Sequence, residues 1–359
     1  MLTNWRRIEK LSEKYSINKE DLILMSLNLS GSITQLSSPR LRMNLTLKYF
    51  PDEKFYFAIP NRINRNETDF EISNDILYLM GEEIGHLTRI ENDDCSSSYF
   101  RRNNTVITLN SNRRSTCEGC KFCPNNLELN SEDLALDTHQ KLRNHLNLVL
   151  SGSNHADMSG IRRLTICTGC FESEERTVQH LLMVYEVAKS MGFLGVLHYI
   201  GSQINSNDTL DLLVNKIDHF MYTMTVECFT NRSKLMNQKK GSLTLDDYKR
   251  LGAESVKRSI TTSTIHILGL DSLQETIDGF RGFYKATNYF PIINLFQPHV
   301  PEHYDLLADD ARDIEYYLTI RKSMEDLYSN ANLKPKAWEC YRSLWYYYYS
   351  NQKVTSVHI

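Results

Sequence analysis

The sequence contains little cysteine, glycine or proline for its 359 residues, namely eight, 15 and eight of each. Eight cysteines are too few for a disulfide scaffold of this length. No apolar stretch approaches the roughly 20 residues that cross a bilayer, and residues 1–7 lead into polar sequence without the apolar core of a signal peptide. We therefore expect a cytoplasmic chain without a membrane partner, in which the thiols stay reduced and available to a metal.

Two further absences narrow the function. Lysine and arginine number 41 against 44 acidic residues, a formal net charge of −3, so the chain has no global basic field and nucleic acid is not an expected partner. The glycine-rich fingerprint G-x-G-x-x-G is missing, which argues against an open dinucleotide-binding sheet. The hydrophobic fraction of 41% and the charged fraction of 24% are typical of a globular protein.

Three of the cysteines nevertheless lie close together. Cys117, Cys120 and Cys123 occur in the run T-C-E-G-C-K-F-C-P-N. Thiolates at this spacing cannot all pair as disulfides, but they can converge on one metal centre. Short C-x-x-C spacing suits an iron–sulfur cluster, because the loop can wrap around a cubane whose irons take thiolate ligands. Three ligands for four irons leave one iron open to bind a substrate or cofactor.

Short apolar runs alternate with helical patterns from about residue 104 onward, which is typical of repeated βα units around a parallel sheet. The predicted strands are 105–109, 163–167, 194–200, 220–227, 264–270 and 290–296. The predicted helices between and after them are 178–188, 209–217, 245–256, 273–284 and 309–328. We therefore predict an α/β fold: a partial (β/α)6 TIM-type barrel over 104–308, an N-terminal α/β extension over 1–103 of unknown role, and a C-terminal helical segment and tail over 309–359.

Polar and glycine residues follow the predicted strands at comparable places. In barrels of this kind, ligand chemistry gathers in the loops after the carboxyl ends of the strands. The three-cysteine loop follows the first strand, as an active-site loop should, whereas a structural zinc site has no reason to lie there. The other candidates at these ends are Gly169 and Glu172, Glu227, Gly269 and Asp271, and Gln297.

Together these motifs resemble the radical S-adenosylmethionine enzymes, over roughly residues 104–305. The resemblance implies that Cys117, Cys120 and Cys123 hold a [4Fe-4S] cluster, whose fourth iron chelates the amino and carboxylate groups of S-adenosyl-L-methionine. The first gap in this chain is one residue shorter than in the commonest family spacing, C-x-x-x-C-x-x-C.

The resemblance also implies which residues contact the cofactor. Phe122 holds the place of the aromatic residue that borders the adenine. Thr168, Gly169 and Glu172 belong to a stretch similar to the family's Gly-Gly-Glu, which contacts the methionine amino group; Cys170 replaces its second glycine. The other residues assigned to the pocket are Glu227 near the ribose, Arg232 as a carboxylate partner, Gly269 and Asp271 beside the adenine, and Asn294 and Gln297 along the wall.

The function implied by the resemblance is reductive cleavage of S-adenosyl-L-methionine into methionine and a 5′-deoxyadenosyl radical, which takes a hydrogen from a substrate. Electrons come from a donor such as flavodoxin or ferredoxin. Because no cysteine-rich C-terminal extension follows, a small-molecule substrate in a biosynthetic setting is favoured, with a peptide as the alternative. The reaction outcome stays open.

Other interpretations of the cysteines compete with this one. Cys167 and Cys170 form a second C-x-x-C pair, which could complete a zinc site, supply the fourth ligand of a closed electron-transfer cluster, or hold an auxiliary cluster. Cys228 could donate a hydrogen atom to a substrate radical. A metal-stabilised binding or electron-transfer protein is therefore the alternative to an enzyme.

Several other residues have structural interpretations. The run 299–303 matches the H-x-x-E-H peptidase pattern, but Pro301 opposes the continuous helix that this pattern needs. His198 and His266 lie within predicted strands, where hydrogen-bonded core histidines are ordinary. The aromatic run 345–349 is expected to pack across the open edge of the barrel.

Overall fold

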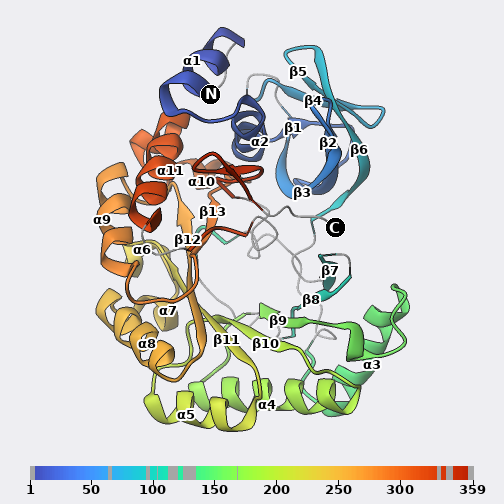
Figure 1. Ribbon diagram of the computed structural model, residues 1–359, viewed down its shortest axis with the longest axis vertical. Coiled ribbons are helices and arrows are strands. Elements are labelled where there is room, and N and C mark those ends of the chain that lie inside the picture. The colour runs from blue at the N-terminus through green and yellow to red at the C-terminus, as the bar shows by residue number, and fades with distance from the viewer. Residues whose placement is uncertain are drawn as a thin grey trace.

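The computed structural model describes residues 5–63, 67–93, 98–102, 104–111, 120–123, 135–167, 169–329, 333–336 and 343–354. In these ranges the chain forms a closed six-stranded barrel, a curled seven-stranded sheet with helices outside it, and a short two-stranded sheet (Figure 1). The fold is therefore mixed α/β, with a closed barrel beside a curled sheet.

The N-terminal part begins with helices and continues as strands. Helices α1 (Trp5–Tyr15) and α2 (Lys19–Ser30) come first. The barrel strands that follow, in chain order, are β1 (Ser32–Ile33), β2 (Arg40–Leu47), β3 (Phe50–Arg62), β4 (Phe70–Ser73), β5 (Ile76–Leu79) and β6 (Glu82–Asn92). Leu41, Met43 and Leu45 of β2 are fully buried, so every second residue of this strand faces the barrel core. The sequence did not predict that this sheet closes.

The larger sheet contains the predicted strands. Its members are β7 (Tyr99–Arg101), β8 (Val106–Leu109), β9 (Arg163–Cys167), β10 (Val196–Gly201), β11 (Phe220–Glu227), β12 (Thr261–Leu268) and β13 (Ile292–Leu295). Strands β8 to β13 pair in parallel, each with the next in the chain, whereas β7 adds an antiparallel edge. Each predicted strand overlaps one of these parallel strands. Because the strands are parallel, their carboxyl ends share one edge of the sheet.

Helices lie between and after the strands of this sheet. They are α3 (His139–Ser151), α4 (Glu174–Ser190), α5 (Asn207–Lys216), α6 (Arg232–Leu235), α7 (Gln238–Gly241), α8 (Leu245–Lys257), α9 (Leu273–Phe283), α10 (Pro301–Tyr304) and α11 (Ile314–Tyr328). Figure 1 shows α4, α5, α8, α9 and α11 along the outside of the curl. Thr244 and Ser272 begin α8 and α9 with capping boxes, which satisfy main-chain N–H groups at the helix starts.

The two faces of the curled sheet differ. Paired residues of neighbouring strands share a face, and successive residues of one strand alternate between faces. His266 of β12 packs against Phe280 of α9, with ring centroids 4.8 Å apart, so its face is the helix-covered one. His198 of β10 lies on the opposite, concave face, where its ring hydrogen-bonds to Thr223 at 2.8 Å and to Thr165 at 3.4 Å. Both histidines are hydrogen-bonded core residues, as the sequence predicted.

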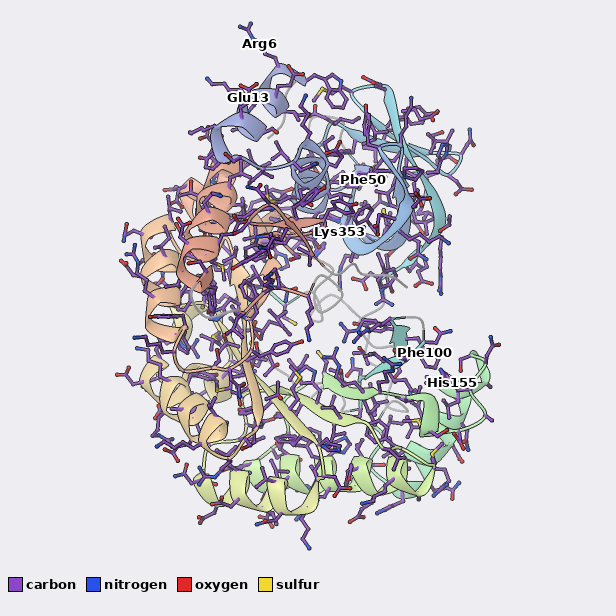
Figure 2. The ribbon with its side chains drawn as sticks, viewed as in Figure 1. Arg6, Glu13, Phe50, Phe100, His155 and Lys353 are labelled. Carbon is purple, nitrogen blue, oxygen red and sulfur yellow. The ribbon has the colours of Figure 1, made fainter. Side chains whose placement is uncertain are left out.

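The C-terminal segment packs back onto the fold through aromatic contacts. Trp345 is fully buried, and its ring lies 5.3 Å from that of Phe290, which precedes the edge strand β13. Tyr347 stacks on Phe50 at 4.2 Å. Lys353 of the hairpin β14 (Tyr348–Tyr349) and β15 (Gln352–Lys353) lies over the Tyr347 ring, 4.8 Å from its centroid; Figure 2 labels Phe50 and Lys353. The predicted packing of the aromatic run at the open edge of the sheet is confirmed.

A buried arginine ties the two ends of the chain together. Arg321 of α11 is 2% exposed and donates to Asp21 of α2 at 2.7 Å, to Glu325 at 3.2 Å, and to the carbonyl oxygens of Leu344 and Tyr348 at 2.7 and 2.6 Å. Asp21 is also fully buried. Buried charges are tolerated when they are paired and hydrogen-bonded, and this group satisfies both conditions.

Replacing Asp21 by alanine is expected to lower the free energy of unfolding by about 3 kcal/mol, because the buried Arg321 loses a carboxylate partner. Urea denaturation of variant and wild type measures the difference. Lys189→Ala is the matched control, since its 3.0 Å ion pair with Asp218 lies at the surface, where such pairs contribute little. Equal losses in the two variants would contradict a central role for Arg321.

Candidate functional site

The described part of the three-cysteine loop, residues 120–123, forms a turn that docks on the segment after β11. The main-chain N–H of Cys123 donates to the Cys120 carbonyl oxygen at 3.0 Å, and that of Lys121 donates to the Leu235 carbonyl oxygen at 2.9 Å. Cys117 lies outside the described residues. The turn brings the two described cysteines of the motif onto one short loop.

This loop packs into a small apolar cluster at the carboxyl edge of the sheet. Cys120 and Phe122 are 5% and 6% exposed. Their neighbours come from the first residues after three parallel strands: Cys228 follows β11, Leu270 follows β12 and Phe296 follows β13. The buried members of the cluster are Cys120, Phe122, Cys228, Leu235, Met236, Leu270 and Phe296. Cys120 and Phe122 are therefore buried where ligands bind in parallel α/β folds.

Asn237 connects the thiols of two loops. Its main-chain N–H donates to the Cys120 Sγ at 3.4 Å, and its side-chain Nδ2 donates to the Cys170 Sγ at 3.7 Å. Its Oδ1 accepts from the main-chain N–H of Lys240 at 2.9 Å, which caps α7. The sequence analysis missed this residue; the only local signal is an asparagine at a helix start, which does not reveal a contact with sulfur.

Glu227 ends β11 in a strained conformation. Its φ is +66°, and the pairing of β11 with β12 shifts register between Thr225 and Glu227. Its carboxylate binds the Lys240 Nζ at 3.0 Å, with the two side chains 9% and 16% exposed. A residue other than glycine at positive φ costs energy and is typical of functional sites. The structure thus places the predicted ribose contact, Glu227, in a buried ion pair at the site.

Arg232 points its donors at the backbone of its own segment. Its NH1 donates to the carbonyl oxygens of Val226 and of Cys228, the latter at 2.9 Å, and its NH2 donates to those of Lys240 and Leu243 at 3.2 and 3.4 Å. These bonds hold the connection between β11 and α8 in shape. The predicted contact with a cofactor carboxylate stays a prediction.

Asp271 and Gly269 shape the loop after β12. The buried Asp271 carboxylate accepts from the main-chain N–H groups of Phe229 and Thr230 at 2.9 and 2.7 Å, while burial raises its pKa. Gly269 has φ +110°, and a Cβ there would lie 3.0 Å from the Tyr317 hydroxyl, so a side chain is strained and crowded. Asp271 joins the loops after β11 and β12, and the contact of Asp271 and Gly269 with adenine remains a prediction.

Asn294 lies on β13, and Gln297 follows that strand. The Gln297 Nε2 donates to the Asn28 carbonyl and side-chain oxygens at 2.7 and 3.0 Å and to the Ala58 carbonyl oxygen at 3.0 Å. Gln297 therefore fastens the sheet to α2 and β3 of the N-terminal part. Asn294 is half-buried and shares a face with its register partner Ile267, which is the concave face.

The residues after β9 differ in environment. Cys170 is buried beside Asn237, whereas Cys167 and Glu172 are exposed and Gly169 is half-buried. Thr168 lies outside the described residues. Among the residues that the structure describes, no three histidine, cysteine, aspartate or glutamate side chains lie close enough together to hold a metal ion.

Cys228 is fully buried in the apolar cluster next to Cys120. Burial raises the pKa of its thiol, and the nearby Asp271 raises it further. The Cys228 thiol therefore keeps its hydrogen at neutral pH, as a hydrogen donor must; this role stays a hypothesis.

The H-x-x-E-H run does not form one helix. Val300 is the N-cap of α10 and Pro301 its first residue, so His299 precedes the helix that carries His303. The ring centroids of the two histidines are 6.2 Å apart. The expectation that Pro301 opposes a continuous helix through this motif is confirmed.

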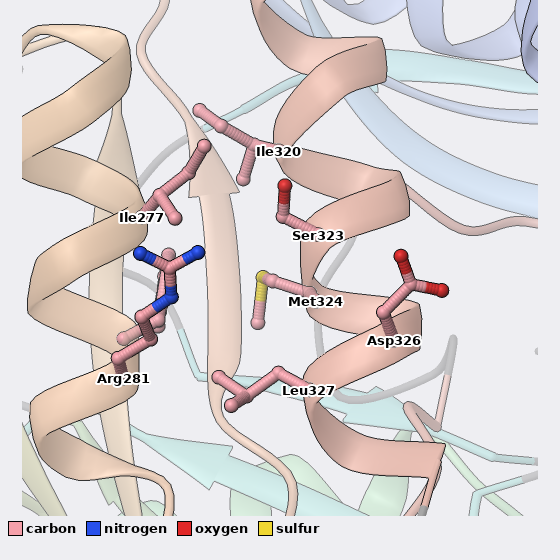
Figure 3. A pocket seen from close by; sticks show the side chains of 8 residues that line it. Ile277, Arg281, Ile320, Ser323, Met324, Asp326 and Leu327 are labelled. Carbon is pink, nitrogen blue, oxygen red and sulfur yellow. The ribbon is translucent and has the colours of Figure 1, made fainter.

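A pocket of about 310 Å³ lies between α9 and α11 on the outer side of the molecule (Figure 3). Ile277, Ile320 and Met324 line it, with Arg281 and Asp326 at its rim. None of its lining residues belongs to the site at the strand ends, so the site and this pocket are separate features.

No protein-family model matches the sequence, and no curated protein matches it. Among solved structures, the chain is similar to a radical S-adenosylmethionine methyltransferase, TsrM, from Kitasatospora setae with cobalamin and a [4Fe-4S] cluster bound, at 10% identity and a TM-score of 0.36. The likeness covers 52% of this chain and 36% of that one, so this chain spans about a third of that protein. A likeness of this size establishes neither the family nor the function of this chain.

In the described ranges no helix combines the length and apolar character that a membrane crossing needs.

The buried His266 predicts a pH dependence of stability. Burial lowers its pKa from 6.5 to about 3, so below pH 6.5 the unfolded chain takes up a proton that the folded chain does not. The contribution of neutral His266 to stability is therefore fully present above pH 6.5, and it falls by about 2 kcal/mol down to about pH 5.

The variant His266→Leu is expected to flatten this fall. Denaturant titrations at several pH values measure it, and the difference from wild type isolates the share of His266 from that of other groups. His139→Gln, at a side chain that is 66% exposed, serves as the control. A His266→Leu curve parallel to that of wild type would show that the histidine is not held neutral.

Proposed function

We propose that the protein is a radical S-adenosylmethionine enzyme, which cleaves S-adenosyl-L-methionine reductively at a [4Fe-4S] cluster and modifies a small molecule. One observation carries the proposal: Cys120 and Phe122 of the three-cysteine loop are buried against the residues that follow β11, β12 and β13. Loops at this edge bind ligands in parallel α/β folds. A peptide is the alternative substrate.

The proposal also covers the barrel architecture, the cellular location and the electron donor. The strands β8 to β13 and their helices form a partial (β/α)6 barrel over residues 104–308, with 1–103 and 309–359 as separate extensions. The protein works in the cytoplasm and takes electrons from a flavodoxin or ferredoxin. Parallel pairing of neighbouring strands in chain order supports the barrel.

The residues at the site fit an iron–sulfur cluster. Cysteine thiolates are its usual ligands, and N–H donors to sulfur and an apolar surrounding tune its potential. The structure supplies Cys120 and Cys123 on one turn, an N–H from Asn237 aimed at the Cys120 Sγ, and an apolar cluster around them. Cys117, Cys120 and Cys123 would hold the cluster.

A bound, reduced cluster would supply the electron for cleavage of the carbon–sulfur bond of the cofactor. The chain's own residues bind and orient the cofactor and the substrate, and they exclude water. Phe122, Leu270 and Phe296 exclude water from the thiols. Glu227, at the end of β11, offers a carboxylate that can accept hydrogen bonds from ribose hydroxyls, while Lys240 offsets its charge.

Cys170 favours a second candidate, an electron-transfer protein with a closed cluster. Its Sγ and the Cys120 Sγ both accept hydrogen bonds from Asn237, so Cys170 is the natural fourth thiolate if one exists. Four thiolates close a cluster and leave no iron for a cofactor. The zinc alternative is less favoured, because Cys167 is exposed and Cys170 buried.

Anaerobic reconstitution with iron and sulfide, followed by reduction in the presence of S-adenosyl-L-methionine, tests the proposal. The enzyme yields brown protein that releases 5′-deoxyadenosine and methionine. Brown protein that releases neither supports the electron-transfer candidate, and colourless protein with stoichiometric zinc contradicts both iron–sulfur functions.

Alanine in place of Cys117, Cys120 or Cys123 is expected to abolish both cluster binding and 5′-deoxyadenosine release, because each removes a thiolate ligand. Iron and sulfide analysis with product chromatography measures the two effects. Cys167→Ala is the matched control and keeps full activity, since this thiol is exposed. Loss of the cluster in Cys170→Ala as well would favour a closed cluster over the enzyme.

A further inference from the structure

The connection between β11 and α8, residues 228–244, meets the cysteine loop at several residues, and Asn237 is the one that reaches a sulfur atom. Asn237 donates its main-chain N–H to the Cys120 Sγ at 3.4 Å and its side-chain Nδ2 to the Cys170 Sγ at 3.7 Å. Both cysteines are 5% exposed. Loops that follow two different strands, β8 and β9, are thus joined at their sulfur atoms by a third loop.

The orientation of Asn237 is fixed from several sides. Its Oδ1 caps α7 by accepting from the Lys240 N–H at 2.9 Å, and the Lys240 side chain is held by Glu227. Arg232 donates to the carbonyl oxygens of Cys228 and Lys240, which lie on either side of Asn237 in the segment. These bonds determine where the main-chain N–H of Asn237 points.

We propose that Asn237 is a positioning residue, which holds the thiols of Cys120 and Cys170 at one place on the strand edge and tunes the group that binds there. Hydrogen bonds to a ligand atom fix its direction, and N–H donors to sulfur stabilise the more negative, reduced form of a cluster. The tuning rests on the proposed function, whereas the positioning does not need a cluster.

The competing explanation is that Asn237 only caps α7. Two substitutions separate the roles. Serine keeps a side-chain oxygen for the cap but removes the Nδ2 donor to Cys170. Alanine removes the donor and the cap, and so also loosens the main-chain N–H that reaches Cys120.

Alkylation of the reduced, metal-free protein with N-ethylmaleimide, read by peptide mass spectrometry, tests the positioning. Asn237→Ala is expected to raise the alkylation rates of both Cys120 and Cys170 about fivefold, in line with the usual effect of losing an N-cap. Asn237→Ser is expected to raise the rate of Cys170 alone. Unchanged rates at both cysteines in Asn237→Ala overturn the proposal.

Thr244→Ala is the matched control. Thr244 caps α8 at the other end of the same segment, through Asp247, and touches neither thiol. Its replacement is expected to leave both alkylation rates unchanged. Rates that rise as much in Thr244→Ala as in Asn237→Ala show a general loosening of the segment and overturn the specific role of Asn237. If Asn237→Ala does not fold, the Cys170 rate in Asn237→Ser decides.

A redox titration followed by electron paramagnetic resonance tests the tuning. The reconstituted Asn237→Ala protein is expected to have a more negative reduction potential than wild type, whereas a purely structural cap leaves the potential unchanged. An equal potential contradicts the tuning. If wild type takes up no cluster but the Asn237 variants show the expected alkylation rates, the proposed function is refuted and the positioning role stands. A cluster that forms and cleaves the cofactor, with unchanged alkylation rates and potential in Asn237→Ala, refutes only the inference.

Discussion

The burial of a short cysteine loop against the carboxyl ends of parallel strands is the constraint on which the site depends. Cys120 and Phe122 belong to one buried cluster with Cys228, Leu270 and Phe296 from the loops after β11, β12 and β13. Parallel pairing in chain order brings these strand ends to one edge, so the sheet creates a place where distant loops meet. Without that edge, the cysteine motif is only a local sequence pattern. With it, the thiols lie where the fold can present a ligand to residues from several strands.

The residues around this edge are joined to one another by hydrogen bonds that need no ligand. Asp271 joins the loops after β11 and β12, Arg232 organises the segment after β11, and Gln297 fastens the sheet to the N-terminal part. A site that positions a reactive species must be rigid, because loosely held groups lose the required geometry. The strained Glu227 lies among these residues, as expected for a site in which the same residues maintain the structure and contact the ligand.

The parallel strands were predictable because short, buried apolar runs of β-branched and aromatic residues give a local signal. The closed N-terminal barrel was not, because closure depends on pairing between short strands, and the stretch 77–90 mixes helix and strand patterns. The cysteine loop was found from its spacing alone. Asn237 was missed, because its contact with Cys120 spans 117 residues of chain. Sequence thus reveals groups that carry unusual chemistry, whereas the ordinary residues that orient them become visible only in the fold.

The most direct test of an incompletely coordinated iron is the Mössbauer spectrum of protein reconstituted with isotopically enriched iron, recorded with and without S-adenosyl-L-methionine. The account predicts that one iron site of the cluster differs from the others and that its signal changes when the cofactor is added. A spectrum of equivalent, thiolate-bound iron sites that the cofactor leaves unchanged would contradict it.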